Sequence, residues 1–175
     1  MSPRTTARVV GWLFIVATLA GIAALALVQP VLDASDYLSK ASANENQVAT
    51  GVLLELVMGT AVVAIAVVIY PVLRRFSQRL ALGFVAARTV EAVIYLIDAI
   101  AVLTLLSVSG DFVDAGTPQS SPFQPLGAAL LAVRDWGGNV VLDVTAFSIS
   151  ALILNFALYR AKLVQPVCVT DEAVA

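Results

Sequence analysis

The sequence predicts an all-α fold, a bundle of four transmembrane helices with both chain ends on the cytoplasmic side. Two observations predict the membrane class. Of the 175 residues, 60% are hydrophobic and only 13% are charged, and the mean hydropathy is +0.94. The apolar residues also form long blocks, and about 20 consecutive apolar residues cross the hydrocarbon core of a bilayer. A third observation, the placement of basic residues, predicts the orientation.

The first predicted helix covers about residues 9–28 and follows Arg4 and Arg8. A signal-peptide core has about 7–15 residues, so this longer block is interpreted as a retained helix. One face of it carries only small side chains, which favours close helix packing in lipid. These residues are Ala17, Ala20, Gly21 and Ala24.

A polar segment, residues 29–47, precedes the second predicted helix at about 48–73. A short helix on the membrane surface and a plain loop are both compatible with the segment. Asn44 followed by Gln47 resembles a capping box, which predicts that the second helix starts here.

The third predicted helix covers about 80–108 and exceeds the length that a bilayer requires, so we expect tilt or a protruding end. An apolar run at 126–133 is too short to span. It is interpreted as a re-entrant piece, an interfacial helix or an extension of the fourth helix, which covers about 138–159. Residues 1–164 then form one transmembrane domain, and 165–175 are expected to be a disordered cytoplasmic tail.

Basic residues predict a multi-pass protein of the cell membrane with cytoplasmic termini. Only Lys40 and Arg134 lie on the opposite side, and Arg88 lies within the third helix. Seven of the ten Lys and Arg residues flank one side: Arg4, Arg8, Arg74, Arg75, Arg79, Arg160 and Lys162.

Composition also excludes several classes of function. The chain has no histidine, which rules out Ser-His-Asp catalysis, histidine metal sites and histidine-ligated haem. Its one cysteine, Cys168, cannot form an internal disulfide. With a net charge of −2 and no long basic cluster, we expect no nucleic-acid partner. No cofactor and no metal ion is predicted.

Charged residues inside the apolar blocks are the most informative feature, because each is costly in hydrocarbon. In the third helix the spacing of three, four and three residues places four polar side chains on one face, which we expect to point into the bundle. The predicted polar pocket combines this face with residues of the second and fourth blocks and of the segment between them. Its members are Glu55, Arg88, Glu91, Tyr95, Asp98, Arg134, Asp135 and Asp143.

Four of these acids face a single intramembrane arginine, Arg88, so some carboxyl groups must stay protonated or a cation, Arg134 or water must enter. One interpretation is a site for a proton, a cation or a polar headgroup. The other is a fold-fixing Arg88–Glu91 pair with neutral, hydrogen-bonded acids around it.

Four stretches of the sequence form a recognisable pattern: "SANENQVATGVLLELVMGTAVVAIAVVIYPVLRR", "ALGFVAARTVEAVIYL", "LLAVRDW" and "LYRAKLV". Together they resemble the domain-of-unknown-function 4386 family of small bacterial membrane proteins. The resemblance runs from the first helix to about Val164 and implies no catalytic role. Family members continue into a further hydrophobic hairpin, whereas this sequence turns to "QPVCVTDEAVA", which predicts an open side for a partner.

Three functions follow from these patterns. The first is a binding or transport-like protein whose polar pocket holds a cation, a proton or a lipid headgroup. The second is a scaffold or subunit that forms a homo-oligomer or packs against a protein partner in the bilayer. The third is a lipid-modifying membrane enzyme that uses Glu55 or Glu91 as its acid–base group. The sequence favours them in that order and does not establish an enzyme.

Overall fold

A computed structural model describes residues 3–116, 122–138 and 147–160, and the described residues are almost entirely helical. The prediction of an all-α fold is confirmed. Asp143, Cys168 and the predicted tail 165–175 lie outside the described residues. The helices are α1 Pro3–Leu32, α2 Tyr37–Ala43, α3 Glu45–Arg74, α4 Gln78–Asp114, α5 Phe123–Arg134 and α6 Ser148–Arg160.

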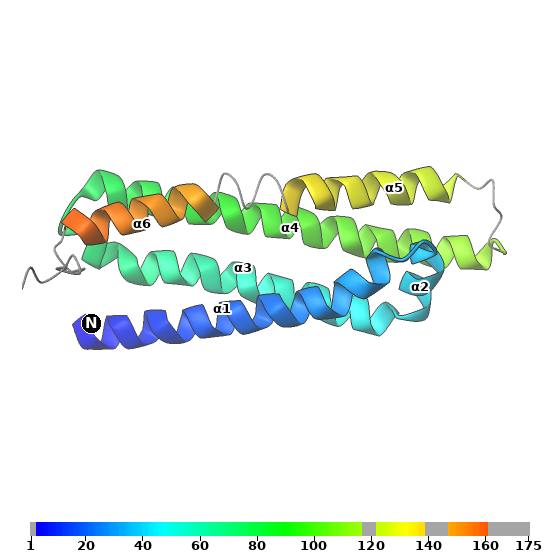
Figure 1. Cartoon of the computed structure of the whole chain (residues 1–175), viewed down its shortest axis with the longest axis horizontal. Helices are drawn as coiled ribbons and strands as arrows, with labels where there is room; N and C mark the ends of the chain where they lie inside the picture. The colour runs from blue at the N-terminus through cyan, green and yellow to red at the C-terminus, as the bar shows by residue number, and fades with distance from the viewer. Residues whose placement is uncertain (1–2, 117–121, 139–146, 161–175) are drawn as a thin grey trace, which may run out of the picture.

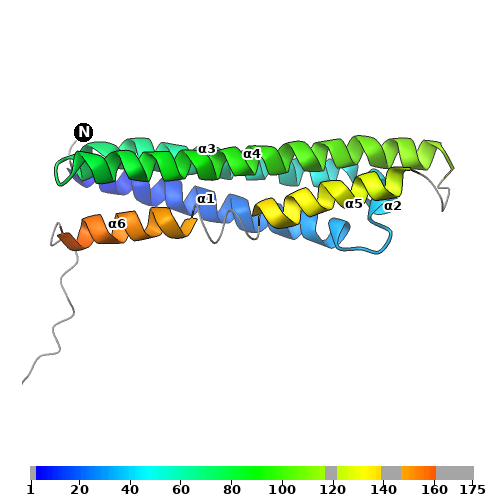
Figure 2. The same ribbon diagram turned by 90° about the horizontal axis from the view of Figure 1, so that it is seen from above.

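Three long helices form the body of the bundle, and α5 and α6 lie one after the other along α4 (Figures 1 and 2). Helices α1, α3 and α4 are long and apolar enough to cross a membrane, with mean hydropathies of 2.4, 2.7 and 2.2 in their most apolar stretches. In lipid every backbone N–H and C=O needs an internal partner, which a continuous helix provides. The fourth predicted span is described only in part, as α6 and the turn that follows α5.

The three long helices extend beyond the predicted blocks at both ends. α4 has 37 residues and is therefore about 55 Å long, well beyond a hydrocarbon core of about 30 Å. Arg, Gln and Glu flank several of the apolar blocks, and because these residues are good helix formers in water, a helix can continue past its apolar block. Hydropathy alone therefore underestimated the lengths.

The second predicted helix, α3, does start directly after Asn44 at its N-cap, but the expected capping box does not form. The Asn44 side chain donates to the carbonyl of Lys40 at 2.8 Å and caps nothing in α3. Gln47 instead donates to the carbonyl of Leu27 at 2.8 Å and ties the start of α3 to α1. The segment before α3 contains a short helix, α2, whose Leu38 and Ala41 are buried.

The apolar run 126–133 is part of α5, which runs lengthwise along α4. Tyr37 of α2 donates a hydrogen bond to the carbonyl of Gln124, 3.3 Å away, and holds the first turn of α5.

Small residues allow α1 and α3 to pack closely, as predicted. Ala17, Ala20 and Ala24 are buried in the contact. A Cβ at Gly21 would lie 2.6 Å from the sulfur of Met58, and a Cβ at Gly51 would overlap the side chain of Val28. The side chains of Met58 and Val28 therefore occupy the space that these two glycines leave open.

Two larger apolar clusters lie one towards each end of the bundle, and a small third one consists of Ile94 with Tyr95 packed against it. The larger one joins α1, α2, α3 and the last half of α4 around Val52 and Leu105. The smaller one contains Ala66, Leu73, Ala81 and Phe84, where α3 meets α4 and α6. The buried charged residues of α3 and α4 lie between these clusters.

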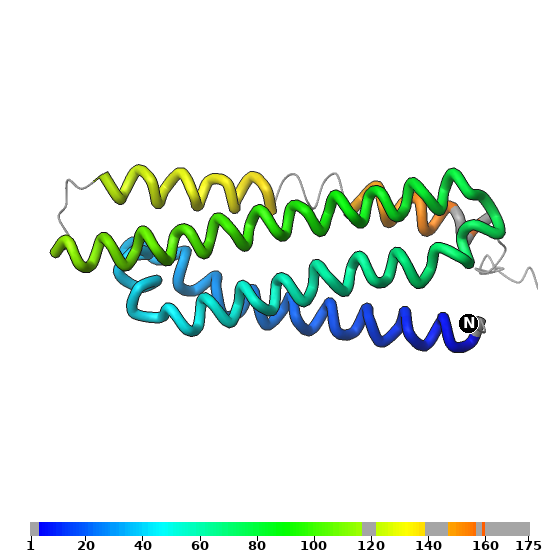
Figure 3. The backbone as a smooth tube through the Cα atoms, turned by 180° about the vertical axis from the view of Figure 1, so that it is seen from behind, coloured from blue at the N-terminus to red at the C-terminus, as the bar shows by residue number. Residues whose placement is uncertain are grey.

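The basic residues gather at one end of the bundle. The start of α1, the turn between α3 and α4, and the end of α6 lie together at this end (Figures 1 and 3). Arg4, Arg8, Arg74, Arg75 and Arg79 therefore share one end.

Candidate functional site

A cavity of about 320 Å³ opens between α1, α3, α4 and the C-terminal end of α5. Its polar wall is formed by five of the residues that the sequence singled out, together with Gln29 of α1. These five are Glu55, Tyr95, Asp98, Arg134 and Asp135. The remaining wall is apolar or small and comes mainly from α1: Gly21, Ala24, Leu25, Met58 and Gly138.

Arg134 joins the two acids of the cavity across three helices. Its Nη1 lies 3.2 Å from Oδ2 of Asp98 on α4 and 3.9 Å from Oε2 of Glu55 on α3. The side chains of Asp98 and Glu55 are only 7% and 10% exposed, and that of Arg134 is 15% exposed. The two carboxyl groups also lie close enough to interact with each other. Two acids thus share one guanidinium.

Two polar atoms of this cluster are buried without an aligned hydrogen bond from any described residue. They are Oδ1 of Asp98 and Nη1 of Arg134. A buried polar atom without a partner costs about 1–3 kcal/mol. Asp98 therefore presents an unused acceptor on the wall of the cavity.

Arg88 and Glu91 form a separate pair, which does not line this cavity. Arg88 Nη1 donates to both carboxylate oxygens of Glu91, at 3.0 and 2.9 Å. The Arg88 guanidinium also lies over the rings of Phe84 and Phe147, 5.5 and 5.7 Å from their centroids. Its neighbours are thus a carboxylate and two aromatic faces, all favourable to a cation.

The predicted polar stripe of α4 is therefore divided between two sites. Arg88, Glu91 and Asp98 are all buried, but only Asp98 and the half-buried Tyr95 reach the cavity. Tyr95 packs over Gly59 of α3, where a Cβ would stand 3.5 Å from its own Cβ. The expected single pocket lined by Arg88 and Glu91 as well is not what the structure shows.

The contribution of α1 to the cavity was missed. Gln29 is a polar residue at the end of an apolar block, and Gly21 lies opposite Met58. The small-residue face predicted close packing with another helix, but nothing in it indicated which helix or that a cavity would form beside it.

Residues 135–138 continue α5 as a π-helical turn, which places Asp135 and Gly138 on the cavity wall. Trp136, in the same turn, has an exposed ring, with 68% of its surface accessible. Such wide turns occur often at functional sites. Asp143, the eighth predicted site residue, lies outside the described residues.

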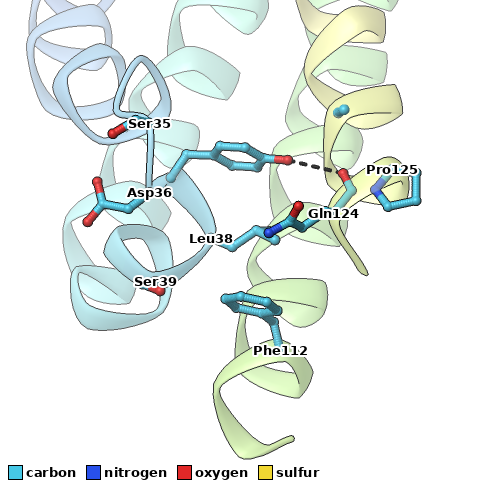
Figure 4. Close-up of a pocket in the computed structure, with 9 residues that line it drawn as sticks. Ser35, Asp36, Leu38, Ser39, Phe112, Gln124 and Pro125 are labelled. Atoms are coloured by element: carbon cyan, nitrogen blue, oxygen red, sulfur yellow. Dashed lines mark hydrogen bonds between the residues drawn. The ribbon is translucent and has the colours of Figure 1, made fainter. Parts of the chain in front are cut away.

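Two larger hollows lie elsewhere on the described surface. One, of about 560 Å³, is an apolar groove between α3 and α4 that includes Gly59 and Leu96. The other, of about 550 Å³, lies between α2, the end of α4 and the start of α5 (Figure 4). Burial raises the pKa of the Tyr37 phenol in this second hollow, so the phenol remains a neutral donor to Gln124 at pH 7.

The chemistry of the cavity wall is set by its carboxyl groups. Among the described residues, no group of three or more Asp, Glu, Cys or His side chains could hold a metal. Carboxylates such as those of Glu55, Asp98 and Asp135 bind ammonium or guanidinium groups through charge-assisted hydrogen bonds.

Comparison with known proteins decides the family. A family model described as "Domain of unknown function (DUF4386)" matches residues 9–167. The chain belongs to the DUF4386 family. The match covers α1 from Val9 onwards and the whole of α2 to α6, and so includes every residue of the cavity wall in this DUF4386 protein. No curated protein matches it. No solved structure matches it either.

Proposed function

We propose that this DUF4386 membrane protein binds a small positively charged group in the cavity around Glu55, Asp98 and Arg134. The observation that carries the proposal is the buried Oδ1 of Asp98, which accepts no hydrogen bond from the described residues while lining a cavity. Three acidic side chains and one arginine form its charged wall. The acids outnumber the base, so a further positive charge would be stabilised there.

The depth of the cavity supports access from the side opposite the basic end. The densest series of exposed large apolar side chains on α4 runs from Leu82 to Leu103, a band of about 32 Å that matches the hydrocarbon thickness, and Val113 is exposed beyond it. Asp98 lies about 8 Å along α4 from Leu103, which marks the end of this band farther from the basic residues. A short path through headgroups would thus connect the cavity with water.

The test of this proposal measures the binding of methylammonium, guanidinium, choline and sodium to the full chain in lipid nanodiscs by calorimetry. We expect saturable binding of at least one organic cation. Glu55→Gln and Asp98→Asn should each weaken it about tenfold or more, the equivalent of about 1.4 kcal/mol. Each variant replaces a carboxyl group of the cavity by an amide of nearly the same shape.

Asp114→Asn is the matched control, because Asp114 is an exposed acid at the end of α4, away from the cavity. It should bind as the unmodified protein does. Equal affinity in the control and in both cavity variants would contradict the proposal, as would the absence of saturable binding of every cation.

We also propose that the protein crosses the cell membrane several times with both termini in the cytoplasm. The support is that the start of α1, the α3–α4 turn and the end of α6 share the end that carries the arginines (Figure 1). Positively charged segments are retained in the cytoplasm during insertion.

Single cysteines placed in a Cys168→Ser background test this orientation in intact cells. A cysteine at Gln78 should resist a membrane-impermeant maleimide, and one at Ser39 should react with it. Both positions lie outside the apolar blocks, in the α3–α4 turn region and in α2. The reverse pattern of labelling would show the opposite orientation.

A further inference from the structure

The two buried arginines of the bundle are held in different ways. Arg88 makes two aligned hydrogen bonds to one carboxylate and lies against two aromatic rings. Arg134 approaches two carboxylates at 3.2 and 3.9 Å, and its Nη1 makes no aligned hydrogen bond with the residues described. Charge attraction places Arg134 in the cavity, but geometry does not fix it there.

A loosely held charge at this position can be exchanged for another. Removing Arg88 would forfeit the two hydrogen bonds that its Nη1 donates to Glu91, whereas removing Arg134 forfeits mainly attraction at a distance. A mobile cation that offers aligned N–H donors would satisfy the free Oδ1 of Asp98, which Arg134 leaves unsatisfied.

We propose that the Arg134 guanidinium occupies the place of the ligand's own cationic group, so that the ligand is a primary ammonium or guanidinium compound. This inference rests on the proposed function. The unsatisfied Oδ1 of Asp98 would be satisfied by an N–H donor, which quaternary ammonium ions and metal ions lack. The apolar wall around Leu25 and Met58 suits a short hydrocarbon body attached to that group.

The start of α5 is anchored, so the exchange requires only that Arg134 turn away. Tyr37 donates to the carbonyl of Gln124, a contact drawn as a dashed line in Figure 4. A Cβ at Gly127 would lie 2.7 Å from the Tyr37 oxygen and 3.1 Å from Leu38, so α5 and α2 touch closely there. Arg134 is the last residue of α5, two helical turns further on, and its long side chain has several staggered conformations.

The same chemistry is offered by a free amine and by the headgroup of an ethanolamine lipid. Both carry a primary ammonium group, and the cavity lies about 8 Å from the edge of the apolar band, within reach of headgroups. The experiment below separates the two sources by the lipid composition of the nanodiscs.

Calorimetry with n-butylguanidinium, n-butylammonium and tetramethylammonium tests the inference on the full chain and on Arg134→Gln. In phosphatidylcholine nanodiscs, we expect n-butylguanidinium and n-butylammonium, which both carry N–H donors, to bind Arg134→Gln about tenfold more tightly than the unmodified protein. A gain of this size follows if Arg134 fills the site for about nine-tenths of the time. Tetramethylammonium should bind both proteins weakly. If half of the lipid is phosphatidylethanolamine, weaker butylammonium binding identifies the headgroup as occupant, and unchanged binding identifies a free amine.

Equal or weaker binding to Arg134→Gln would overturn the inference, and so would tight binding of tetramethylammonium. The proposed function would still stand in that case if the unmodified protein bound a cation and the single variant Glu55→Gln did not. It would fail separately if no cation bound either protein.

A second measurement uses the unmodified protein and so does not depend on whether Arg134→Gln folds. In protein with ¹⁵N-labelled arginine, the Arg134 side-chain resonance is assigned from its absence in Arg134→Lys. Butylguanidinium should shift it towards the position of solvent-exposed arginines and leave the Arg88 resonance unchanged. An Arg134 resonance that stays in place at saturation would overturn the inference.

Discussion

Glu91→Leu is expected to lower the free energy of unfolding by about 3–5 kcal/mol, the cost of removing one partner of a buried ion pair. Glu91 is 2% exposed, and both of its carboxylate oxygens accept from Arg88. The variant leaves the Arg88 charge buried without its carboxylate. Unfolding in mixed micelles with increasing dodecyl sulfate, followed by circular dichroism, measures the loss.

The double variant Arg88→Met with Glu91→Leu should recover most of that stability, because an apolar pair of similar volume replaces the two charges. Asp36→Asn is the control for an ion pair in water. Its partner Lys40 lies 3.8 Å away and both side chains are about half exposed, so the change should cost about 0–1 kcal/mol. A Glu91→Leu protein as stable as Asp36→Asn would show that the buried pair does not stabilise the bundle.

Phe84→Ala is expected to cost about 3–5 kcal/mol, the range for truncation of a fully buried phenylalanine. Phe84 is 0% exposed and packs with Ala66, Leu73 and Ala81 in the smaller apolar cluster. The variant opens a cavity in that cluster and removes one of the rings beside Arg88. The same micelle titration measures the effect.

Phe147→Ala separates these two contributions. Its ring lies 5.7 Å from the Arg88 guanidinium, nearly the distance of Phe84, but Phe147 is 50% exposed. Its truncation should cost only about 0.5–1 kcal/mol, the value of an exposed cation–π contact. If both variants lost equal stability, the ring contact and not the buried volume would explain the effect of Phe84→Ala.

The sequence predicted the local features of the bundle well. Apolar blocks locate α1, α3 and α4 because the bilayer permits few alternatives to a continuous helix. The Arg88–Glu91 pair is predictable because residues three apart on a helix are neighbours. The small face of α1 follows from the same periodicity.

The contacts between distant segments were not predictable from the sequence. Arg134 meets Glu55 and Asp98 only because α5 folds back along α4, and no local pattern reports that path. Gln47 illustrates the same limit, because it has the right spacing for a capping box but bonds to Leu27 of α1. A tertiary partner replaced the local one, and the charged stripe was divided between two sites for the same reason.

The charged layer between the two apolar clusters has a consequence for how the helices align. Ala, Val and Leu contacts look similar at each turn, so apolar helices can slide past one another by a turn of about 5.4 Å with little change in packing. A slide of one turn would carry Asp98 away from Arg134 and set both against hydrocarbon. The charged layer thus favours one alignment of α3, α4 and α5 along their helix axes.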